Sequence, residues 1–278
     1  MESGISNQIT CENTVILDDL SLYAEEFTVG RGRTACLLIH GLGGGPIQMR
    51  ELAEALAPLN ITTRGILLPG HCCSYEDLEG VSSKDWYKKV EDEYVKLKEE
   101  YEDVAVVGFS LGALLALKLA VNNPVKKVVV MGAPIFIIRR YLPMSGLIKL
   151  CGSFLRKVKI ASGNWPISTE VFSGCLRLPI YSHFPMSSLL ALTNLIDTIR
   201  YELNRIKSPI LIIHSKRDSA ASPSSADYIS KYVGSNEKKL VWLEQSHHLI
   251  MHDREKETVF SEIRHFLGGE VTKEFLLT

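Results

Sequence analysis

Gly108-Phe109-Ser110-Leu111-Gly112 is the stretch of sequence that decides how this chain folds. Its Gly-x-Ser-x-Gly pattern follows an apolar run at residues 104–107 and precedes a helical pattern at residues 113–121. A strand that turns sharply into a helix at a serine forms a nucleophile elbow, whose strained backbone holds the hydroxyl clear of the sheet. The flanking glycines are needed because a Cβ there would collide with the neighbouring strand or helix. The pattern predicts that Ser110 is a nucleophile, with a glycine-rich β–α turn as the alternative.

Apolar runs and helical patterns alternate along the rest of the chain. Strands are expected at residues 35–39, 61–67, 127–131, 210–214 and 240–243, and helices at residues 47–59, 84–101 and 255–266. This alternation favours an α/β fold with a mostly parallel, doubly wound sheet and right-handed crossovers. Residues 15–29 are expected to add one or two antiparallel edge strands.

One segment departs from this alternation. Roughly eighty residues separate the strand that ends at Met131 from the strand that begins at Ile210. A single crossover helix needs far fewer residues. Residues 133–207 are therefore expected to form a helical lid inserted into a core made of residues 1–132 and 208–278.

The overall composition excludes several classes of protein. The length of 278 residues suits one large α/β domain, and a net charge of −1 gives no reason to expect nucleic acid as a partner. The N-terminus lacks a signal-peptide pattern, and no apolar run is long enough to span a membrane, so the cytoplasm is the expected compartment. The spacing of cysteines and histidines predicts neither a metal nor a cofactor. Two free thiols are favoured over a vicinal disulfide at Cys72 and Cys73.

A serine nucleophile needs a histidine base, which in turn needs an orienting carboxylate. In nucleophile-elbow enzymes the acid follows a later strand. Asp218 lies just after the strand expected at residues 210–214, whereas the loop after the preceding strand holds no acid. The alternative for Asp218 is a surface carboxylate paired with Arg217 or Lys216. Asp227 fits less well because it lies within the next helical pattern.

Two adjacent histidines, His247 and His248, follow the last expected strand and precede the terminal helix. Neighbouring side chains point in different directions, so only one of them can face Ser110. The residues alone leave that choice open. His252 lies further along the chain and is expected to be exposed to solvent.

The glycine-rich loop at residues 40–45 is the candidate oxyanion loop. An oxyanion hole needs two backbone N–H groups, and Leu111, after the nucleophile, and Leu42, in this loop, are the expected donors. The loop lacks the Lys-Ser/Thr ending of a phosphate-binding loop and the Gly-x-Gly-x-x-Gly pattern of a dinucleotide site. His40 is expected to brace the loop by hydrogen bonding, and His71 is expected to cap a turn.

With these residues assembled, the chain resembles the carboxylesterase and monoacylglycerol lipase branch of the α/β-hydrolase superfamily. The resemblance is carried by residues 38–44, 68–71, 85–86, 108–113 and 244–248. Bacterial carboxylesterases of this group carry a motif similar to Ser-Gly-His in the last segment, which implies that His248 is the base and that His247 replaces a glycine. The second oxyanion donor of the group is often aromatic, but only its backbone N–H is used, so Leu42 can serve.

The sequence thus predicts a serine hydrolase that cleaves carboxylic esters of short-to-medium acyl chains through an acyl-enzyme, with monoacylglycerols as candidate substrates. Thioesterase, acyltransferase and amidase activities remain alternatives because the same triad serves them. A non-catalytic, ligand-binding relative of this fold is the alternative from another class. The expected partner is a small-molecule ester, and the oligomeric state is not predicted.

The first half of the expected lid is basic. Residues 133–169 contain no Asp or Glu but include Arg139, Arg140, Lys149, Arg156, Lys157 and Lys159. The segment carries +6, which leaves −1 − 6 = −7 for the remainder of the chain. Either the lid covers the pocket with its apolar side while its basic side is solvated, or the basic side contacts an anionic lipid surface.

Overall fold

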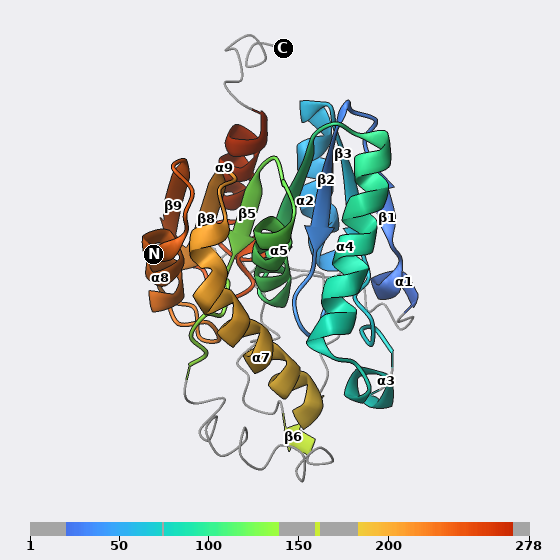
Figure 1. Cartoon of the computed structure of the whole chain (residues 1–278), viewed down its shortest axis with the longest axis vertical. Helices are drawn as coiled ribbons and strands as arrows, with labels where there is room; N and C mark the ends of the chain where they lie inside the picture. The colour runs from blue at the N-terminus through green and yellow to red at the C-terminus, as the bar shows by residue number, and fades with distance from the viewer. Residues whose placement is uncertain (1–20, 74, 139–158, 162–182, 269–278) are drawn as a thin grey trace, which may run out of the picture.

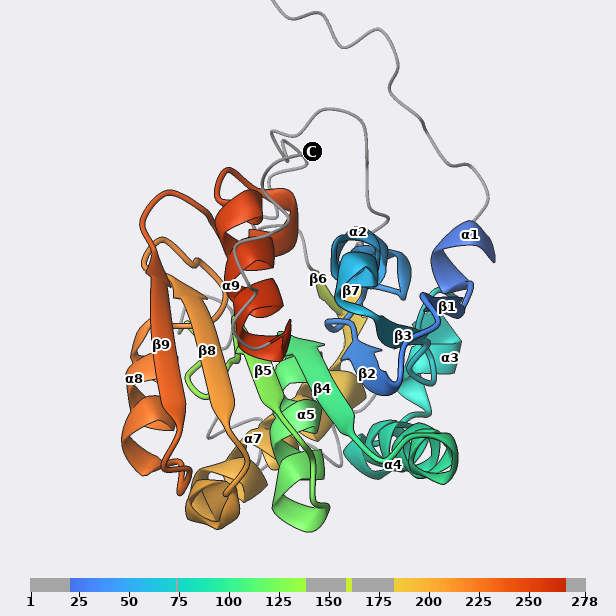
Figure 2. The ribbon, with the colours of Figure 1, turned by 90° about the horizontal axis from the view of Figure 1, so that it is seen from above.

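The centre of the fold is a seven-stranded sheet (Figures 1 and 2), seen in a computed structural model that describes residues 21–73, 75–138, 159–161 and 183–268. In spatial order the strands are β1 (Phe27–Val29), β3 (Ile61–Ile66), β2 (Thr34–Ile39), β4 (Val104–Phe109), β5 (Val128–Met131), β8 (Ile210–Ser215) and β9 (Lys238–Leu243). β1 runs antiparallel to β3, and all other neighbours in the sheet are parallel. The predicted mostly parallel α/β sheet is confirmed.

Helices cover both faces of the sheet (Figure 2). One face carries α4 (Ser83–Glu100), α5 (Leu111–Asn122), α7 (Met186–Glu202) and α8 (Ser224–Tyr232), and the other carries α2 (Ile47–Leu56) and α9 (Lys256–Gly268). Each face has its own apolar cluster, one around Trp86 and Leu114 and one around Leu52 and Phe260. Burial on both faces explains why the central strands read as continuous apolar runs rather than as alternating ones.

The parallel register brings the carboxyl ends of β2, β4, β5 and β8 together at one end of the sheet. Ile39 of β2 pairs with Gly108 of β4, Phe109 with Met131 of β5, and Met131 with Ile213 of β8. The loops that follow these strands therefore leave the sheet side by side, which is where open α/β sheets bind their ligands.

The N-terminal expectation is partly wrong. β1 is an antiparallel edge strand as predicted, but residues 21–24 form the short helix α1 (Ser21–Ala24), and residues 15–20 lie outside the described residues. The reason is packing, because this turn buries the Tyr23 ring and lays its carbonyl against Gly45. Short elements that the sequence did not reveal are α3 (Tyr75–Glu79), η1 (Ala57–Leu59), η2 (Leu203–Arg205) and η3 (Ile250–His252).

The segment between β5 and β8 is described only in part. It contains the antiparallel pair β6 (Lys159–Ala161) and β7 (His183–Pro185), followed by α7, which packs against α4 and α5 (Figure 1). The five basic residues from Arg139 to Lys157 lie outside the described residues. The lid boundaries and the lipid contact therefore remain predictions. Within the described ranges, none of the helices combines the length and apolar character needed to cross a bilayer.

Candidate active site

The turn between β4 and α5 holds Ser110 in an unusual backbone conformation, with φ 53° and ψ −114°. A positive φ at a residue other than glycine costs about 1–3 kcal/mol and persists only where the surroundings enforce it. Here the Ser110 N–H donates to the Met131 carbonyl at 2.9 Å. A Cβ on Gly108 would overlap the Gly112 carbonyl, and one on Gly112 would overlap the Ile39 carbonyl. The two glycines thus allow the close approach that the elbow requires.

Ser110, His248 and Asp218 form one chain of hydrogen bonds. The Ser110 Oγ lies 3.0 Å from His248 Nε2, and His248 Nδ1 lies 2.7 Å from Asp218 Oδ2. Because an ionised Asp218 can only accept, the proton of the neutral imidazole sits on Nδ1. His248 Nε2 then presents a lone pair to the serine hydroxyl, which is the tautomer that a general base needs.

Asp218 is buried, with 4% of its surface exposed. Its Oδ1 accepts the N–H groups of Ala220 and Ala221 at 2.8 and 2.9 Å. Burial opposes ionisation, but the imidazoles of His248 and His214 outweigh it, so the pKa of Asp218 lies below its ordinary value. These contacts do not fit the surface-pair alternative for Asp218.

His247 faces away from the serine. Its N–H and its Nδ1 both contact Asp253 Oδ2, at 2.6 and 3.2 Å, and its side chain is 44% exposed. The two adjacent histidines therefore differ in environment as well as direction. Only His248 reaches Ser110.

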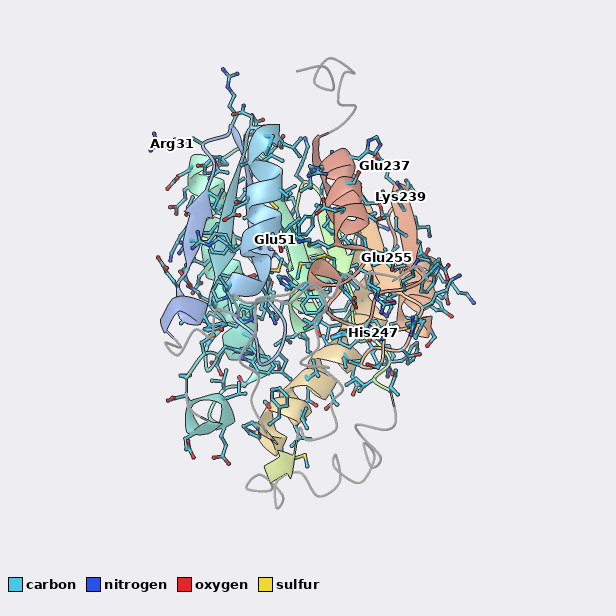
Figure 3. All side chains as sticks on the ribbon, turned by 180° about the vertical axis from the view of Figure 1, so that it is seen from behind. Arg31, Glu51, Glu237, Lys239, His247 and Glu255 are labelled. Atoms are coloured by element: carbon cyan, nitrogen blue, oxygen red, sulfur yellow. The ribbon has the colours of Figure 1, made fainter. Side chains whose placement is uncertain are left out.

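Glu255 orders the loop that carries these histidines, a role that was not predicted from the sequence. Its carboxylate accepts the N–H groups of Glu244, Gln245 and Ser246 and the Ser246 hydroxyl. Burial opposes ionisation of Glu255, but these donors outweigh it and lower its pKa. Figure 3 labels Glu255 and His247, which come from neighbouring turns after β9. An acid at the first residue of the helix expected at residues 255–266 was the available signal, but helix starts favour acids for other reasons.

The glycine-rich loop after β2 lies against the elbow. A Cβ on Gly41 would press on the Phe109 ring and on the Ser110 Cβ. Leu42 from this loop and Leu111 from the first turn of α5 both line the pocket beside Ser110. The Gly41 N–H is itself engaged, because it donates to Gln48 Oε1 at 3.2 Å.

His40 braces this loop from behind. Its Nε2 lies 3.0 Å from the Leu68 N–H, which can only donate, so the proton of the neutral ring is on Nδ1 and is donated to the Gly41 carbonyl at 2.8 Å. Burial, reinforced by the neighbouring His71, lowers the pKa of His40 to about 3. Both ring nitrogens are occupied, as the expected bracing role requires.

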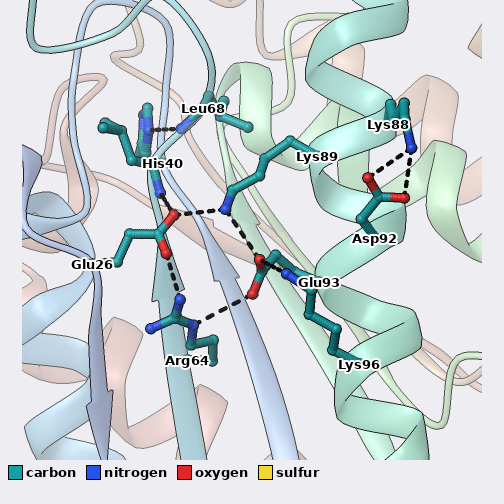
Figure 4. Close-up of polar contacts among 10 residues, drawn as sticks. Glu26, His40, Arg64, Leu68, Lys88, Lys89, Asp92, Glu93 and Lys96 are labelled. Carbon is teal, nitrogen blue, oxygen red and sulfur yellow. Dashed lines mark hydrogen bonds and ion pairs between the residues drawn. The ribbon is translucent and has the colours of Figure 1, made fainter.

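An ion-pair cluster fixes the segment to which His40 binds (Figure 4). Glu26 contacts Arg64 and Lys89 and also accepts the Leu67 N–H at 3.0 Å, one residue before the His40 partner Leu68. Glu93, which is nearly buried, joins the cluster through Arg64 and Lys89. The cluster therefore anchors the loop after β3, and through His40 the oxyanion loop.

His71 completes this buried group. Its Nδ1 lies 3.1 Å from the Pro69 carbonyl, as expected of a turn cap, and its ring packs against Trp86. Its Nε2 is buried and has no hydrogen-bond partner in the described part of the chain. Burial lowers the pKa of His71 to about 4.

These two histidines should make the protein acid-labile. Both stay neutral in the folded state but take up protons in the unfolded chain below about pH 6.5. The unfolded state therefore binds more protons, and the free energy of unfolding should fall as the pH drops from 6.5 towards 4. Each histidine contributes about 1.4 kcal/mol per pH unit within that window. Urea unfolding at several pH values should give a shallower pH slope for His71→Phe than for the wild type, and identical slopes would contradict the assignment.

The expectation for His252 is wrong. The 3₁₀ turn η3 folds back under α2, so that only 6% of His252 is exposed and its Nε2 donates to the Gln48 carbonyl at 3.0 Å. Sequence distance from the triad suggested solvation, but the turn at residues 250–252 was not foreseen. His252 supports the start of α2 instead.

A pocket opens above Ser110. The described residues that line it are Gly41, Leu42, Gly43, Gln48, Phe109, Ser110, Leu111, Pro134, Ile137, Phe184, Leu192, Ala220, Ala221, His248 and Leu249. The walls are largely apolar and come from the glycine-rich loop after β2, from the elbow, from α2, β7 and α7, and from the loops after β5, β8 and β9. Such a pocket suits an uncharged organic substrate.

Nothing among the described residues forms a metal site, since no three His, Cys, Asp or Glu side chains gather there in a suitable group. Cys36 and Cys72 are free thiols. Neither of these cysteines lines the pocket.

The elbow lies at the carboxyl end of a central strand in a mostly parallel sheet, and a histidine and a buried carboxylate lie in line behind its serine. These features together define the class of α/β-hydrolases. The chain belongs to the family whose model is described as "Serine aminopeptidase, S33", which matches residues 30–255.

Two curated relatives narrow the activity. A carboxylesterase of Bacillus subtilis (strain 168) is 32% identical over 87% of this chain and 95% of its own length. A thermostable monoacylglycerol lipase of Bacillus sp. (strain H-257) is 31% identical over 88% of this chain and 94% of its own. The chain is accordingly an esterase-type serine hydrolase that acts on small-molecule esters.

Solved structures share the fold. One, reported for the metagenome-derived lipolytic enzymes LipS and LipT, superposes with a TM-score of 0.77 at 24% identity and covers 88% of this chain and 97% of that one. The monoacylglycerol lipase of Paleococcus ferrophilus gives 0.73 at 18% identity, over 88% and 98% of the two chains.

Proposed function

We propose that Ser110 is the nucleophile of a carboxylic-ester hydrolase, with His248 as its base and Asp218 as the acid that orients His248. The proposal rests on the hydrogen bonds of 3.0 Å from Ser110 Oγ to His248 Nε2 and of 2.7 Å from His248 Nδ1 to Asp218. As Ser110 Oγ attacks the ester carbonyl, its proton passes to His248 Nε2. The imidazolium then protonates the leaving alcohol, and the acyl group stays on Ser110.

The oxyanion formed in this step is held by the backbone N–H groups of Leu42 and Leu111. Leu111 supports this role because it begins α5, where the first N–H groups have no partner within the helix. Water then attacks the acyl-enzyme while His248 takes its proton. As the second tetrahedral intermediate collapses, the bond from Ser110 Oγ to the acyl carbon breaks, His248 returns the proton to Oγ, and the carboxylic acid leaves.

Pre-steady-state kinetics test the covalent intermediate. Mixing the enzyme with a p-nitrophenyl ester should release a burst of p-nitrophenol of about one equivalent per active site, if deacylation is the slower step. Adding an alcohol acceptor separates a hydrolase from an acyltransferase, because a transferase would form the new ester in preference to the free acid. A non-catalytic binder would give neither burst nor turnover.

The substrates we propose are uncharged esters of short-to-medium acyl chains, including monoacylglycerols. The apolar pocket wall and the names of the two curated relatives support this choice. A panel of glyceryl and ethyl esters with graded acyl length should show turnover of uncharged esters that exceeds turnover of a dicarboxylic monoester by at least about tenfold, since burying an unpaired carboxylate is costly. Matching acyl thioesters and aminoacyl arylamides test the thioesterase and amidase alternatives, and faster cleavage of either would overturn the ester assignment.

The lid is part of the same proposal. We assign residues 133–207 to it, with Phe184 and Leu192 covering the pocket from that side. The basic first half of the lid is proposed to contact anionic lipid. Vesicle co-sedimentation at low and at high salt tests this contact.

A further inference from the structure

The pocket has one polar side chain beyond Ser110 and His248. Among its described lining residues that side chain is Gln48, the second residue of α2. The other walls are glycine, alanine, proline or larger apolar residues. Among the described residues, Gln48 is therefore the one side-chain donor beyond Ser110 and His248 that a substrate oxygen can meet in this pocket.

The orientation of the Gln48 amide follows from its partner. The Gly41 N–H can only donate, so the atom 3.2 Å away must be the oxygen Oε1, and the NH₂ group points the other way. Gln48 Nε2 donates to no group in the described part of the chain. It is also not one of the fully buried polar atoms that lack a partner there. Gln48 is 6% exposed and lines the pocket, so we infer that this unused donor serves a group bound there.

The donor is held rigidly. The Gln48 N–H donates to the Gly45 carbonyl at 3.0 Å, and the Gln48 carbonyl accepts from His252 Nε2. The amide group itself lies on Gly44, where a Cβ would overlap both Oε1 and Nε2. The glycine-rich loop and the start of α2 therefore fix this side chain before substrate arrives, which limits the entropy lost on binding.

We propose that Gln48 is a specificity-determining residue that donates a hydrogen bond from Nε2 to a hydroxyl oxygen in the alcohol part of the ester. The inference rests on the proposed function, because it assigns the ester carbonyl oxygen to Leu42 and Leu111. The acyl chain has no further oxygen, so the acceptors left over belong to the alcohol. Esters of polyhydroxy alcohols such as glycerol are then favoured over esters of plain alkyl alcohols.

A matched pair of substrates tests this role. 1-Monooctanoylglycerol and propyl octanoate share the acyl chain and the three-carbon alcohol skeleton, and differ by two hydroxyl groups. Because both form the same octanoyl-enzyme, the ratio of their kcat/KM values reports only the acylation step. Gln48→Glu keeps an oxygen that can accept from the Gly41 N–H but has no donor, whereas Gln48→Leu lacks both groups.

The glyceryl-to-propyl ratio should fall roughly three- to tenfold in Gln48→Glu, as expected for the loss of one neutral hydrogen bond. Gln48→Leu should lower the same ratio and, in addition, lower kcat for both esters because the oxyanion loop loses its brace. Gly44→Ala should also lower the ratio, since its Cβ displaces the Gln48 amide. Full pH profiles of each variant separate these effects from a change in His248, and melting temperatures confirm folding.

An unchanged ratio in Gln48→Glu and Gly44→Ala, with both esters still cleaved, overturns the inference and leaves the proposed function intact. An equal fall for both esters also overturns it and makes Gln48 a part of the oxyanion site instead. A wild-type enzyme that cleaves neither ester refutes the proposed function itself.

Discussion

Ser110→Ala should lose ester hydrolysis by about 10⁴- to 10⁶-fold while the protein keeps its fold. Alanine has no oxygen to attack the carbonyl, so no acyl-enzyme can form. The backbone strain at φ 53° is similar for serine and alanine, and the Ser110 N–H keeps its bond to the Met131 carbonyl. Steady-state turnover of a p-nitrophenyl ester measures the loss, and circular dichroism checks the fold.

A fluorophosphonate probe gives an independent readout of the same site. Peptide mapping should find the label on Ser110 in the wild type and nowhere in Ser110→Ala. Ser224→Ala is the matched control, because Ser224 is exposed on α8 and does not line the pocket. Label on another serine, or turnover retained in Ser110→Ala, would end the assignment of the nucleophile.

His248→Ala should approach the inactivity of Ser110→Ala, whereas His247→Ala should keep most of the wild-type rate. His248 alone contacts both Ser110 and Asp218, so its removal takes away the base and the nearest partner of Asp218 Oδ2. His247 is half exposed and contacts Asp253, where it can affect only the shape of the loop. Values of kcat measured for the two variants side by side make the comparison.

The reverse ranking of the two variants would show that the loop after β9 places His247 at the serine in the working enzyme. Equal, severe losses would instead indicate that loop order is limiting. Glu255→Gln separates these outcomes, because it perturbs the loop at the carboxylate that accepts from residues 244–246 without touching either histidine.

Much of the fold could be predicted because each signal was local. The elbow needs two glycines around a serine, and the apolar runs before it and after it gave the order of strands. The choice between His247 and His248 was different, since it depends on which way one loop turns. The residues left it open, and only the resemblance to a known family favoured His248.

Gln48, Glu255 and His252 could not be predicted for a related reason. Each contacts a backbone group outside its own helix or turn, such as the Gly41 N–H for Gln48 and the Gln48 carbonyl for His252. Side chain to backbone contacts of this kind leave no residue pattern, because almost any residue can supply the backbone partner. The edge helix α1 was missed because its position depends on packing against Gly45.

Because the proposed site is built from loops at the carboxyl ends of several parallel strands, it has a consequence for how the enzyme folds. The proposed site combines residue 42 with residues 110, 218 and 248, each from a loop after a different strand. Parallel pairing over such sequence distances forms slowly, since long loops must close first. During synthesis the nucleophile emerges long before its base, so a growing chain is inactive until β9 and the loop that carries His248 have been made. Recovery of activity during refolding should therefore report the docking of β8 and β9, because Asp218 and His248 lie in the loops that follow these two strands.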